Sequence, residues 1–495
     1  MDRVSVLQNT VLGSRIAEDE VDELHAYFVE TDQWQKLVSG KIDVVFGSKG
    51  SGKSALYSLL VAKRDELRLQ GRTLFMAAEN PRGTPVFRDL SAEGDLTEDG
   101  FRNLWKLYFL SLTADYVRHQ MHTVGRKDAS ALEVIELLTA QGLLMPDISL
   151  LTRLRGVMEY LRKFMPEIEG SITDPSGMVY GGKITFGEPT IEQRGLGYRS
   201  LDNLLAQVNK YLSSQEITVW LALDRLDVAF ADSDELEGMA LKSLFRTYMD
   251  MMGLSHVKIK IFLRDDIWQK IVKGGFREAS HLTRSMTLSW DSKSLLNLIV
   301  RRLVSNADIC TLYNVKSEDV LASEDQQKAF FSTVFPPQVD IGKSKPQTLD
   351  WMLSRTADGT RRTAPRELIH LLLAARDEQL KQDELGSADQ DQTFLISRHA
   401  IRAGLLSVSK ARYEQTLCAE NPSLQPYLQK LDRQKAQQSV ATLARVWGCS
   451  EVRAAEVIER LVESGFFERR GTRDVPIYWV PMLYRGALNL VQGAA

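Results

Sequence analysis

The sequence predicts an α/β protein in which a parallel-sheet domain comes first, a helical domain follows, and a small helix-and-hairpin module closes the chain. Three observations predict this order. Short apolar runs alternate with helical stretches up to residue 290, and strands that alternate with helices form parallel sheets with right-handed crossovers. Beyond residue 290 the strand-like runs stop. Residues 436–495 then show two short helices and two strands around a turn, the order of a winged helix-turn-helix.

Five apolar runs supply the predicted strands of the parallel sheet. They lie at residues 42–46, 73–78, 217–223, 259–263 and 286–290. Short continuous runs of this kind are typical of strands that are buried on both faces. The stretch between the second and third runs, about 89–200, is mostly helical, apart from a hairpin predicted at 178–186. We therefore expect a helical insertion within the sheet domain.

The same pattern sets the expected domain boundaries. An amphipathic helix at 292–305 opens the helical domain, and a second helix starts at Pro365. The polar and acidic residues 382–391 indicate a linker or an exposed loop. The expected division is an N-terminal segment at 1–40, a sheet domain at 41–290 with its insertion at about 89–200, a helical lid at 291–385, a linker and helix at 386–435, and a winged helix-turn-helix at 436–495.

Composition excludes several classes of protein. Of the 495 residues, 44% are hydrophobic and 26% are charged, the balance of an ordinary globular protein. No apolar run is long enough to span a membrane and the N-terminus lacks a secretion signal, so we expect a cytoplasmic protein without a membrane partner. The three cysteines form no CxxC pair, which argues against a zinc site or a disulfide frame. The net charge of −3 limits nucleic-acid contact to a local patch.

A phosphate-binding motif stands between the first predicted strand and the helix that follows it. Residues 47–54 match GxxxxGK[ST] at every position. Glycines let the backbone curl so that its N–H groups face a phosphate, and the helix N-terminus adds its dipole. Lys53 is expected to reach the β- and γ-phosphates, and the Ser54 hydroxyl to ligate magnesium. The sequence thus predicts a P-loop that binds ATP with Mg²⁺ through Gly47, Ser48, Lys49, Gly50, Ser51, Gly52, Lys53, Ser54 and Ala55.

Polar residues that follow the third and fourth predicted strands are candidate catalytic groups. Asp224 ends the strand at 217–223, where an acidic residue can anchor magnesium or cap the next turn. Asp227 is the nearest further carboxylate, and it either orients the attacking water or complements a helix dipole. Arg264 follows the fourth strand, where an arginine can touch the γ-phosphate or pair with neighbouring carboxylates.

Arg366 is the candidate catalytic residue of the helical domain. It follows Pro365 at the start of a helix, from which it can lean over the nucleotide and report the γ-phosphate; a solvated first-turn side chain is the alternative. Together with the P-loop these residues predict an ATPase that hydrolyses ATP to ADP and phosphate. Many ATPases carry glutamate directly after the first aspartate, and Arg225 at that position here argues against fast hydrolysis.

The C-terminal module carries charges that bear on a DNA-binding function. Its predicted recognition helix holds more glutamates than arginines, and phosphates repel such a surface. The predicted wing is more basic, with Arg469, Arg470 and Arg473 clustered around Gly471. Backbone contact with DNA through the wing is therefore compatible with the sequence, whereas base recognition by the helix is disfavoured. Protein docking or covering of the nucleotide is the favoured function of this module.

The order of these parts resembles the AAA+ and STAND group of ATPases, and most of all the origin-recognition-like branch. The segments FGSKGSGKSALYSLL, LALDRLD, IFLRDDIW and APRELI together resemble a bacterial family of P-loop ATPases often found near mobile elements and phage-defence genes. The resemblance covers about residues 20–385. It implies nucleotide-binding roles for Lys53, Ser54 and Asp224, and γ-phosphate contacts for Arg264 and Arg366. It also implies that residues 27–34, with an aromatic residue or Val29, pack on the adenine; core packing is the alternative.

Three functions are compatible with the sequence. The first is an ATP-hydrolysing switch that forms a homo-oligomer and controls assembly or a partner effector; the family resemblance implies a setting in bacterial phage defence. The second is a DNA-loading or remodelling ATPase that grips duplex DNA with its wing. The third is a transcription regulator whose P-loop only senses nucleotide. DNA-stimulated turnover would favour the second, and specific promoter binding with negligible turnover would favour the third.

Overall fold

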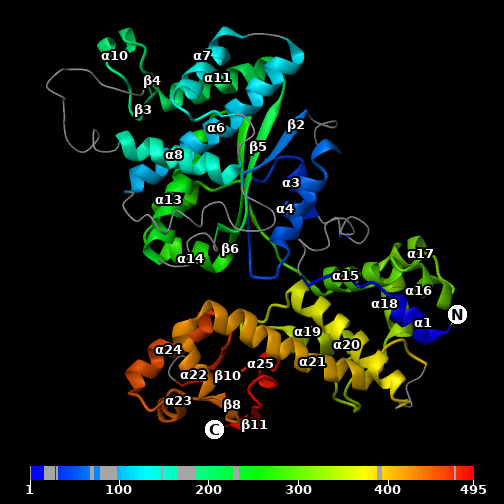
Figure 1. Cartoon of the computed structure of the whole chain (residues 1–495). Coiled ribbons are helices and arrows are strands. Elements are labelled where there is room, and N and C mark those ends of the chain that lie inside the picture. The colour runs from blue at the N-terminus through cyan, green and yellow to red at the C-terminus, as the bar shows by residue number, and fades with distance from the viewer. Residues whose placement is uncertain are drawn as a thin grey trace. The chain divides into compact units, whose positions relative to one another are not determined.

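The structure is a computed structural model that divides into two compact units (Figure 1). The sheet unit comprises Thr31–Gly47 and Lys53–Leu288, and the helical unit comprises Met1–Glu30, Ser48–Gly52 and Ser289–Ala495. The described residues are 2–15, 28, 32–66, 72–78, 97–125, 128–145, 149–164, 184–226, 234–386, 393–472 and 475–494. In these ranges no helix is long and apolar enough to cross a membrane.

A five-stranded parallel sheet forms the centre of the sheet unit. Its strands are β1 (Val44–Gly47), β2 (Thr73–Ala77), β5 (Thr218–Leu223), β6 (Val257–Arg264) and β7 (Ser285–Thr287), in the order β2-β5-β6-β1-β7. All neighbouring strands run parallel. Every residue of β1 is buried, as the continuous apolar run predicts. The predicted α/β fold class with a parallel sheet is therefore confirmed.

Several helices of the sheet unit belong to the long insertion between β2 and β5. The bounds of the helices of this unit are α3 (Asp32–Val38), α4 (Lys53–Ala62), α6 (Glu98–Val124), α7 (Ala129–Ala140), α8 (Leu150–Phe164), α10 (Ile191–Gly195), α11 (Leu201–Ser214), α13 (Asp234–Met251), α14 (Asp265–Lys273) and the 3₁₀ turn η3 (Arg277–His281). Of the hairpin predicted at 178–186, the structure describes only the second strand, where β3 (Ile184–Thr185) pairs in parallel with β4 (Arg199–Ser200). The hairpin itself stays a prediction. Residues 178–183 lie outside the described ranges.

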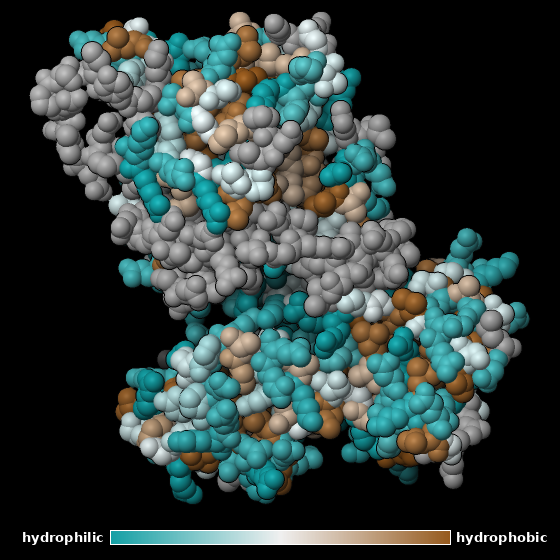
Figure 2. All heavy atoms as spheres, in the orientation of Figure 1, coloured by the Kyte–Doolittle hydropathy of each residue, from teal (hydrophilic) through white to brown (hydrophobic). Residues whose placement is uncertain are grey.

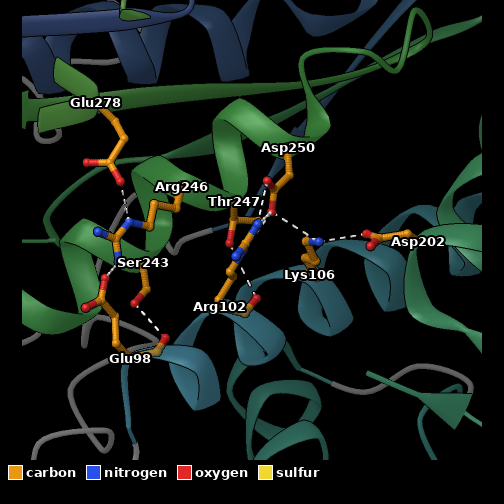
Figure 3. Close-up of polar contacts among 9 residues, drawn as sticks. All are labelled: Glu98, Arg102, Lys106, Asp202, Ser243, Arg246, Thr247, Asp250 and Glu278. Atoms are coloured by element: carbon orange, nitrogen blue, oxygen red, sulfur yellow. Dashed lines mark hydrogen bonds and ion pairs between the residues drawn. The ribbon is translucent and has the colours of Figure 1, made fainter. Parts of the chain in front are cut away.

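Helix α6 joins the insertion to the rest of the sheet unit. Its Trp105 and Tyr108 are fully buried, and they donate hydrogen bonds to the carbonyl oxygens of Ala240 (3.0 Å) and Ala78 (2.8 Å). Polar contacts between α6 and α13 supplement this packing (Figure 3). Arg102 forks onto Asp250 with two bonds of 2.7 Å. Trp105 and Tyr108 belong to the same hydrophobic core as the strands of the sheet, so the insertion and the sheet form one packed body.

A buried charge cluster lies at the beginning of β1. Lys260, whose side chain is 1% exposed, places its Nζ 2.8 Å from Asp43 Oδ1. Arg284 and the Tyr248 hydroxyl also bond to the Asp43 carboxylate. Burial would raise the pKa of Asp43, but Lys260 and Arg284 outweigh it and hold the pKa below its ordinary value. The cluster therefore satisfies an ammonium group that the sheet buries.

The helical unit contains α1 and the helices that follow the sheet. Their bounds are α1 (Arg3–Asn9), α15 (Ser292–Val304), α16 (Ala307–Leu312), α17 (Ser317–Leu321), α18 (Glu324–Val334), α19 (Thr348–Thr356), α20 (Pro365–Glu384), α21 (Arg398–Arg412), the π-helical turn η4 (Tyr413–Cys418), the 3₁₀ turn η5 (Pro422–Leu424) and α22 (Gln425–Gln429). The apolar stripe of the helix predicted at 292–305, Leu295, Leu296, Ile299 and Leu303, is buried.

The structure differs from the sequence pattern in the start of the predicted linker and in the placement of the N-terminal segment. The linker predicted from residue 382 begins too early, because α20 continues to Glu384 and its Gln379 accepts a hydrogen bond from the Ser397 backbone (2.8 Å). Residues 387–391 of that linker are outside the described part of the chain. The predicted N-terminal segment 1–40 is divided between the units, with α1 in the core of the helical unit and α3 in the sheet unit.

The C-terminal elements form a small four-stranded sheet with three helices. They are β8 (Lys435–Gln438), α23 (Val440–Trp447), α24 (Glu451–Glu463), β9 (Glu468–Gly471), β10 (Pro476–Trp479), α25 (Met482–Arg485) and β11 (Val491–Ala494). The sheet order is β11-β8-β10-β9. Ser450 caps α24 by accepting a bond from Arg453 N, as expected for an N-cap serine. The helices and the β9–β10 hairpin have the element order on which the winged-helix prediction rests, and that identification stays a prediction.

Candidate nucleotide-binding site

The predicted phosphate loop connects the end of β1 to the start of α4. Gly50 (φ 81°) and Gly52 (φ 97°) have left-handed backbones, which L side chains rarely adopt. Ser51 N donates to Ser48 O (3.1 Å), which closes the turn. Helix α4 begins at Lys53 and is ten residues long. This arrangement gives the loop the curled backbone and the helix N-terminus that an anion-binding turn requires.

Lys53 lies against the root of the loop. It is 8% exposed, and its Nζ donates to Gly47 O over 2.8 Å. Ser54 and Ala55 follow in the first turn of α4 and are half-buried. The Lys53 ammonium group thus lies at the end of β1, where the loop starts. Ser54 is the next residue, in the first turn of α4.

Three neighbouring strands bring the other predicted residues of the sheet unit to the same edge. In the register of the sheet, Gly47 pairs with Arg264 and Leu223 pairs with Ile261. Strand β6 therefore lies between the strand of the phosphate loop and the strand that Asp224 follows. The carboxyl ends of parallel strands meet at one edge of a sheet. The structure thus places Asp224 and Arg264 at the edge from which the phosphate loop starts.

Asp224 is buried and the chain turns sharply after it. Its residue exposure is 3%, which is low for an aspartate. The next residue, Arg225, has φ 59°, a left-handed conformation that is uncommon for a residue with a β-carbon. Asp227 lies outside the described residues. A buried carboxylate at a strand end suits the predicted magnesium anchor, and the water-orienting role of Asp227 stays a prediction.

The Arg264 guanidinium is held by a neighbouring carboxylate. Its Nε and Nη2 atoms lie 3.0 Å and 2.7 Å from the two oxygens of Asp266, in the first turn of α14. Burial would raise the pKa of Asp266, but its bonds with Arg264 outweigh burial and keep the pKa low. The carboxylate pairing that the sequence left open is therefore present. A γ-phosphate would have to share this guanidinium with Asp266.

In the helical unit, Arg366 lies beside the phosphate loop. A β-carbon built on Gly50 would stand 3.1 Å from Arg366 Cβ and 3.4 Å from both Ala364 Cβ and Glu367 Oε2. Gly50 is thus needed for close approach as well as for its backbone angle. Arg366 is half-buried, and in the described part of the chain no hydrogen bond or ion pair joins its guanidinium to another residue. The structure therefore brings together the loop and the arginine that the sequence predicted for the lid.

Two further residues of the helical unit hold the loop, and the sequence pattern did not single them out. Trp290 Nε1 donates to Ser51 O over 2.8 Å, and its ring lies 3.9 Å from the position of a Gly52 β-carbon. Glu420 forms an ion pair with Lys49. Neither residue belongs to a motif. Their positions follow from chain packing over hundreds of residues, so no local signal could have identified them.

The predicted adenine-side residues are described only in part. Of residues 27–34, Phe28 and residues 32–34 are described, and Val29 is not. Trp34 is 3% exposed on α3, where it packs within the sheet unit. The residues present nevertheless fit a nucleoside triphosphate with Mg²⁺ on the phosphate side. They supply a glycine-constrained loop at a helix N-terminus, the amine of Lys53, the hydroxyl of Ser54 and the buried carboxylate of Asp224.

The sequence and structure were compared with known proteins. No protein-family model matches the sequence, and no curated protein matches it. Among solved structures, Cdc6p of Pyrobaculum aerophilum aligns over 99% of this chain and 97% of its own, with 12% identity and a TM-score of 0.28. The ORC2 protein of Aeropyrum pernix, solved as ADPNP–ADP complexes, aligns over 98% and 96% of the two chains, with 12% identity and a TM-score of 0.36. Scores this low do not establish a common fold.

Proposed function

We propose that this protein binds ATP with Mg²⁺ at residues 47–55 and hydrolyses it to ADP and phosphate. The observation that carries the proposal is the phosphate loop itself, which joins a fully buried strand to a helix that starts at Lys53 and has glycines at its two left-handed positions. In the reaction, water attacks the γ-phosphorus and the bond from that phosphorus to the β–γ bridging oxygen breaks. The bridging oxygen leaves with ADP, and the oxygen of the attacking water becomes part of the released phosphate.

The positions of Lys53, Ser54, Asp224 and Arg264 support the roles proposed for them, and the role proposed for Asp227 rests on the sequence alone. Lys53 neutralises charge on the β- and γ-phosphates, and Ser54 and Asp224 hold the magnesium ion, Ser54 directly and Asp224 as its anchor at the strand end. Asp227 orients the attacking water. Arg264, which also bonds to Asp266, stabilises the γ-phosphate from the end of β6. These roles are electrostatic, which suits a phosphoryl transfer whose charge is spread over oxygen atoms.

We further propose that the protein is a nucleotide-dependent switch of the AAA+/STAND kind, with an origin-recognition-like order of parts. Support comes from Arg366, which lies beside Gly50 without another partner in the described part of the chain. ATP would give this guanidinium a γ-phosphate ligand and ADP would not, which is the difference in contact that a conformational switch requires. The output would be assembly of a cytoplasmic homo-oligomer or control of a partner effector, and the family resemblance favours a setting in bacterial phage defence.

A DNA-loading ATPase and a nucleotide-sensing transcription regulator are the alternatives. Both would use the C-terminal module on DNA, and the charges there disfavour them. Arg469 pairs with Glu459 and Arg470 pairs with Glu468, so wing arginines already have carboxylate partners. A phosphate would have to displace these carboxylates before it gained a contact.

The test compares nucleotide binding and turnover in three variants. Lys53→Ala is expected to weaken ATP binding strongly, since it removes the phosphate-neutralising amine. Asp224→Asn should bind nucleotide but need far more magnesium, and turnover should fall about a hundredfold or more, the usual scale for a catalytic electrostatic group. Arg366→Ala should bind ADP normally and lose affinity for a non-hydrolysable ATP analogue by about tenfold or more, the scale of a charged hydrogen bond.

The matched control is Lys41→Ala, which removes an exposed lysine just before β1. It should leave both affinities unchanged. Labelled nucleotide titrations give the affinities, and released phosphate gives the turnover. Wild-type ATP affinity in Lys53→Ala would refute the phosphate-loop assignment.

A further inference from the structure

A buried charge cluster lies where α20 begins, directly next to Arg366. Glu367 is 4% exposed, and its Oε1 accepts a hydrogen bond of 2.9 Å from Arg412 Nη1. Arg412 is the last residue of α21. Its guanidinium also lies 3.4 Å from the fully buried Tyr484 hydroxyl and 3.9 Å from Asp358 Oδ2. The Arg412 cation thus joins the segment 358–367 to Tyr484, which lies much later in the sequence.

One end of this cluster faces the phosphate loop. Glu367 Oε2 is buried and accepts no hydrogen bond from the described residues, and it lies 3.4 Å from the position of a Gly50 β-carbon. Arg366, the residue directly before Glu367, packs against the same glycine. A displacement of Glu367 would therefore move the start of α20 against the loop and would move Arg366 with it.

The other end of the cluster lies in the C-terminal module, defined here as residues 435–494. Tyr484 belongs to α25 of that module. The loop that precedes α20 docks on the same module, because Gly359 N donates to Gly465 O (2.7 Å) and Arg361 pairs with Glu468 (2.6 Å). A β-carbon on Gly359 would stand 2.5 Å from Phe467 O, so the two backbones are in close contact. The module is thus attached to the start of α20 on both sides of Arg366.

We infer that Glu367 and Arg412 are positioning residues through which the C-terminal module sets the placement of Arg366 beside the phosphate loop. The inference deepens the proposed function and rests on it, since it assigns the pair a role in discriminating ATP from ADP. The two residues touch neither phosphate nor magnesium in this scheme. They fix the first turn of α20, so that γ-phosphate contact by Arg366 and docking of the module favour each other.

A merely structural ion pair would behave differently. Loss of a buried pair lowers stability, and it would weaken ADP and ATP binding alike. A positioning pair changes the ratio of the two affinities, because only the ATP complex uses Arg366. By linkage, the module must also respond to the nucleotide, since coupling between two sites is reciprocal. These two readouts separate the positioning role from the structural one.

The experiment uses the full chain and measures dissociation constants for ADP and a non-hydrolysable ATP analogue. Glu367→Gln keeps the shape of the side chain and removes its charge, and Arg412→Lys keeps the charge and removes the fork. Each should reduce the preference for the ATP analogue over ADP by about three- to thirtyfold, the range of networks that couple two sites. Hydrogen–deuterium exchange of residues 435–494, which should differ between the two nucleotides in wild type, should lose that difference.

Three further variants make the outcome decisive. Arg402→Lys alters an exposed arginine of α21 that pairs with Asp340, and it should match wild type. Tyr484→Phe removes only a hydroxyl, so it reports on the cluster even where a charged variant does not fold, and it should shift the preference in the same direction. If Arg366→Ala keeps the ATP preference of wild type, the proposed sensor role fails. If Arg366→Ala loses it while Glu367→Gln, Arg412→Lys and Tyr484→Phe keep it, only the present inference is overturned.

Discussion

At the scale of single residues, the buried Asp43–Lys260 pair shows how the sheet unit tolerates charge in its interior. A lysine on a central strand would leave an uncompensated ammonium in the core, and the Asp43 carboxylate at 2.8 Å offsets part of that cost. Arg284 bonds to the same carboxylate. Its role in this structure is therefore to hold the start of β1.

The first stability prediction concerns this pair. Asp43→Asn should lower the free energy of unfolding by about 3–5 kcal/mol, because it leaves the buried Lys260 ammonium without its closest counter-charge. The double variant Asp43→Asn with Lys260→Met should recover part of that loss, since both charges are gone. Chemical denaturation of the wild type and the two variants measures these differences. Equal stability of wild type and Asp43→Asn would contradict the assigned role.

The same pair gives a pH dependence with a definite sign. The folded-state pKa of Asp43 lies below its ordinary value, so the unfolded chain binds the proton more tightly. The stabilisation is therefore present above about pH 4, the unperturbed carboxyl range, and is lost as the pH falls through the folded pKa. Unfolding free energies measured between pH 6 and pH 3 should fall less steeply in Asp43→Asn than in the wild type.

At the scale of elements, α1 is an integral part of the helical unit. Val6 and Leu7 are fully buried in the same core as α15, α18 and α20, and α1 contacts α16 and α20. The residues after the helix are held by side chains, because Arg302 and Arg376 donate to the carbonyl oxygens of Leu12 and Thr10, each over 2.7 Å. An N-terminal segment far from the helical domain in sequence therefore completes its core.

We predict that Leu7→Ala destabilises the helical unit by about 2–5 kcal/mol, the usual cost of such a cavity. The matched control is Val11→Ala, whose side chain is 50% exposed and whose loss should cost within about 0.5 kcal/mol. Thermal unfolding measures the loss of stability, and hydrogen exchange of α15 and α20 shows whether the loss occurs in the helical unit. Unchanged protection of those helices in Leu7→Ala would show that α1 is dispensable.

At the scale of the whole molecule, charge and surface polarity favour a protein switch over a DNA-binding machine. The net charge is −3, and the wing arginines Arg469 and Arg470 are paired with glutamates. Among the described residues, exposed large apolar side chains are few, and on the face shown in Figure 2 the coloured hydrophobic and hydrophilic residues are interspersed. No broad apolar patch is visible among the coloured residues of that face.

We predict that duplex DNA binds weakly and through few phosphates. Arg469 and Arg470 together contribute about −2 to the slope of log affinity against log salt, since each phosphate contact contributes about −0.9. ATP turnover should be the same with and without DNA. Fluorescence anisotropy at several salt concentrations measures the slope, and Arg469→Ala with Arg470→Ala should remove that contribution. A slope several times steeper, or DNA-stimulated turnover, would favour the DNA-loading alternative.

The local parts of the site could be predicted from the sequence because their causes are local. Glycines at 50 and 52 are required where the backbone is left-handed, and Lys53 starts the helix directly after them. The alternation of short apolar runs with helical stretches likewise identified all five parallel strands, since burial on both faces leaves a continuous apolar run. Motif and periodicity act over a few neighbouring residues, so one sequence was sufficient.

The long-range parts were decided only by tertiary structure. The sequence alone determined that the chain has a phosphate loop and a parallel sheet, whereas packing decided that β6 lies between β1 and β5, so that Arg264 stands opposite Gly47. Packing also placed Trp290 and Glu420 on the loop, and Arg412 on Glu367. Each of these contacts joins residues at least 45 positions apart in the sequence. Their side chains carry no periodicity or spacing that marks the partner, because the partner is selected by the shape and charge of the whole folded chain.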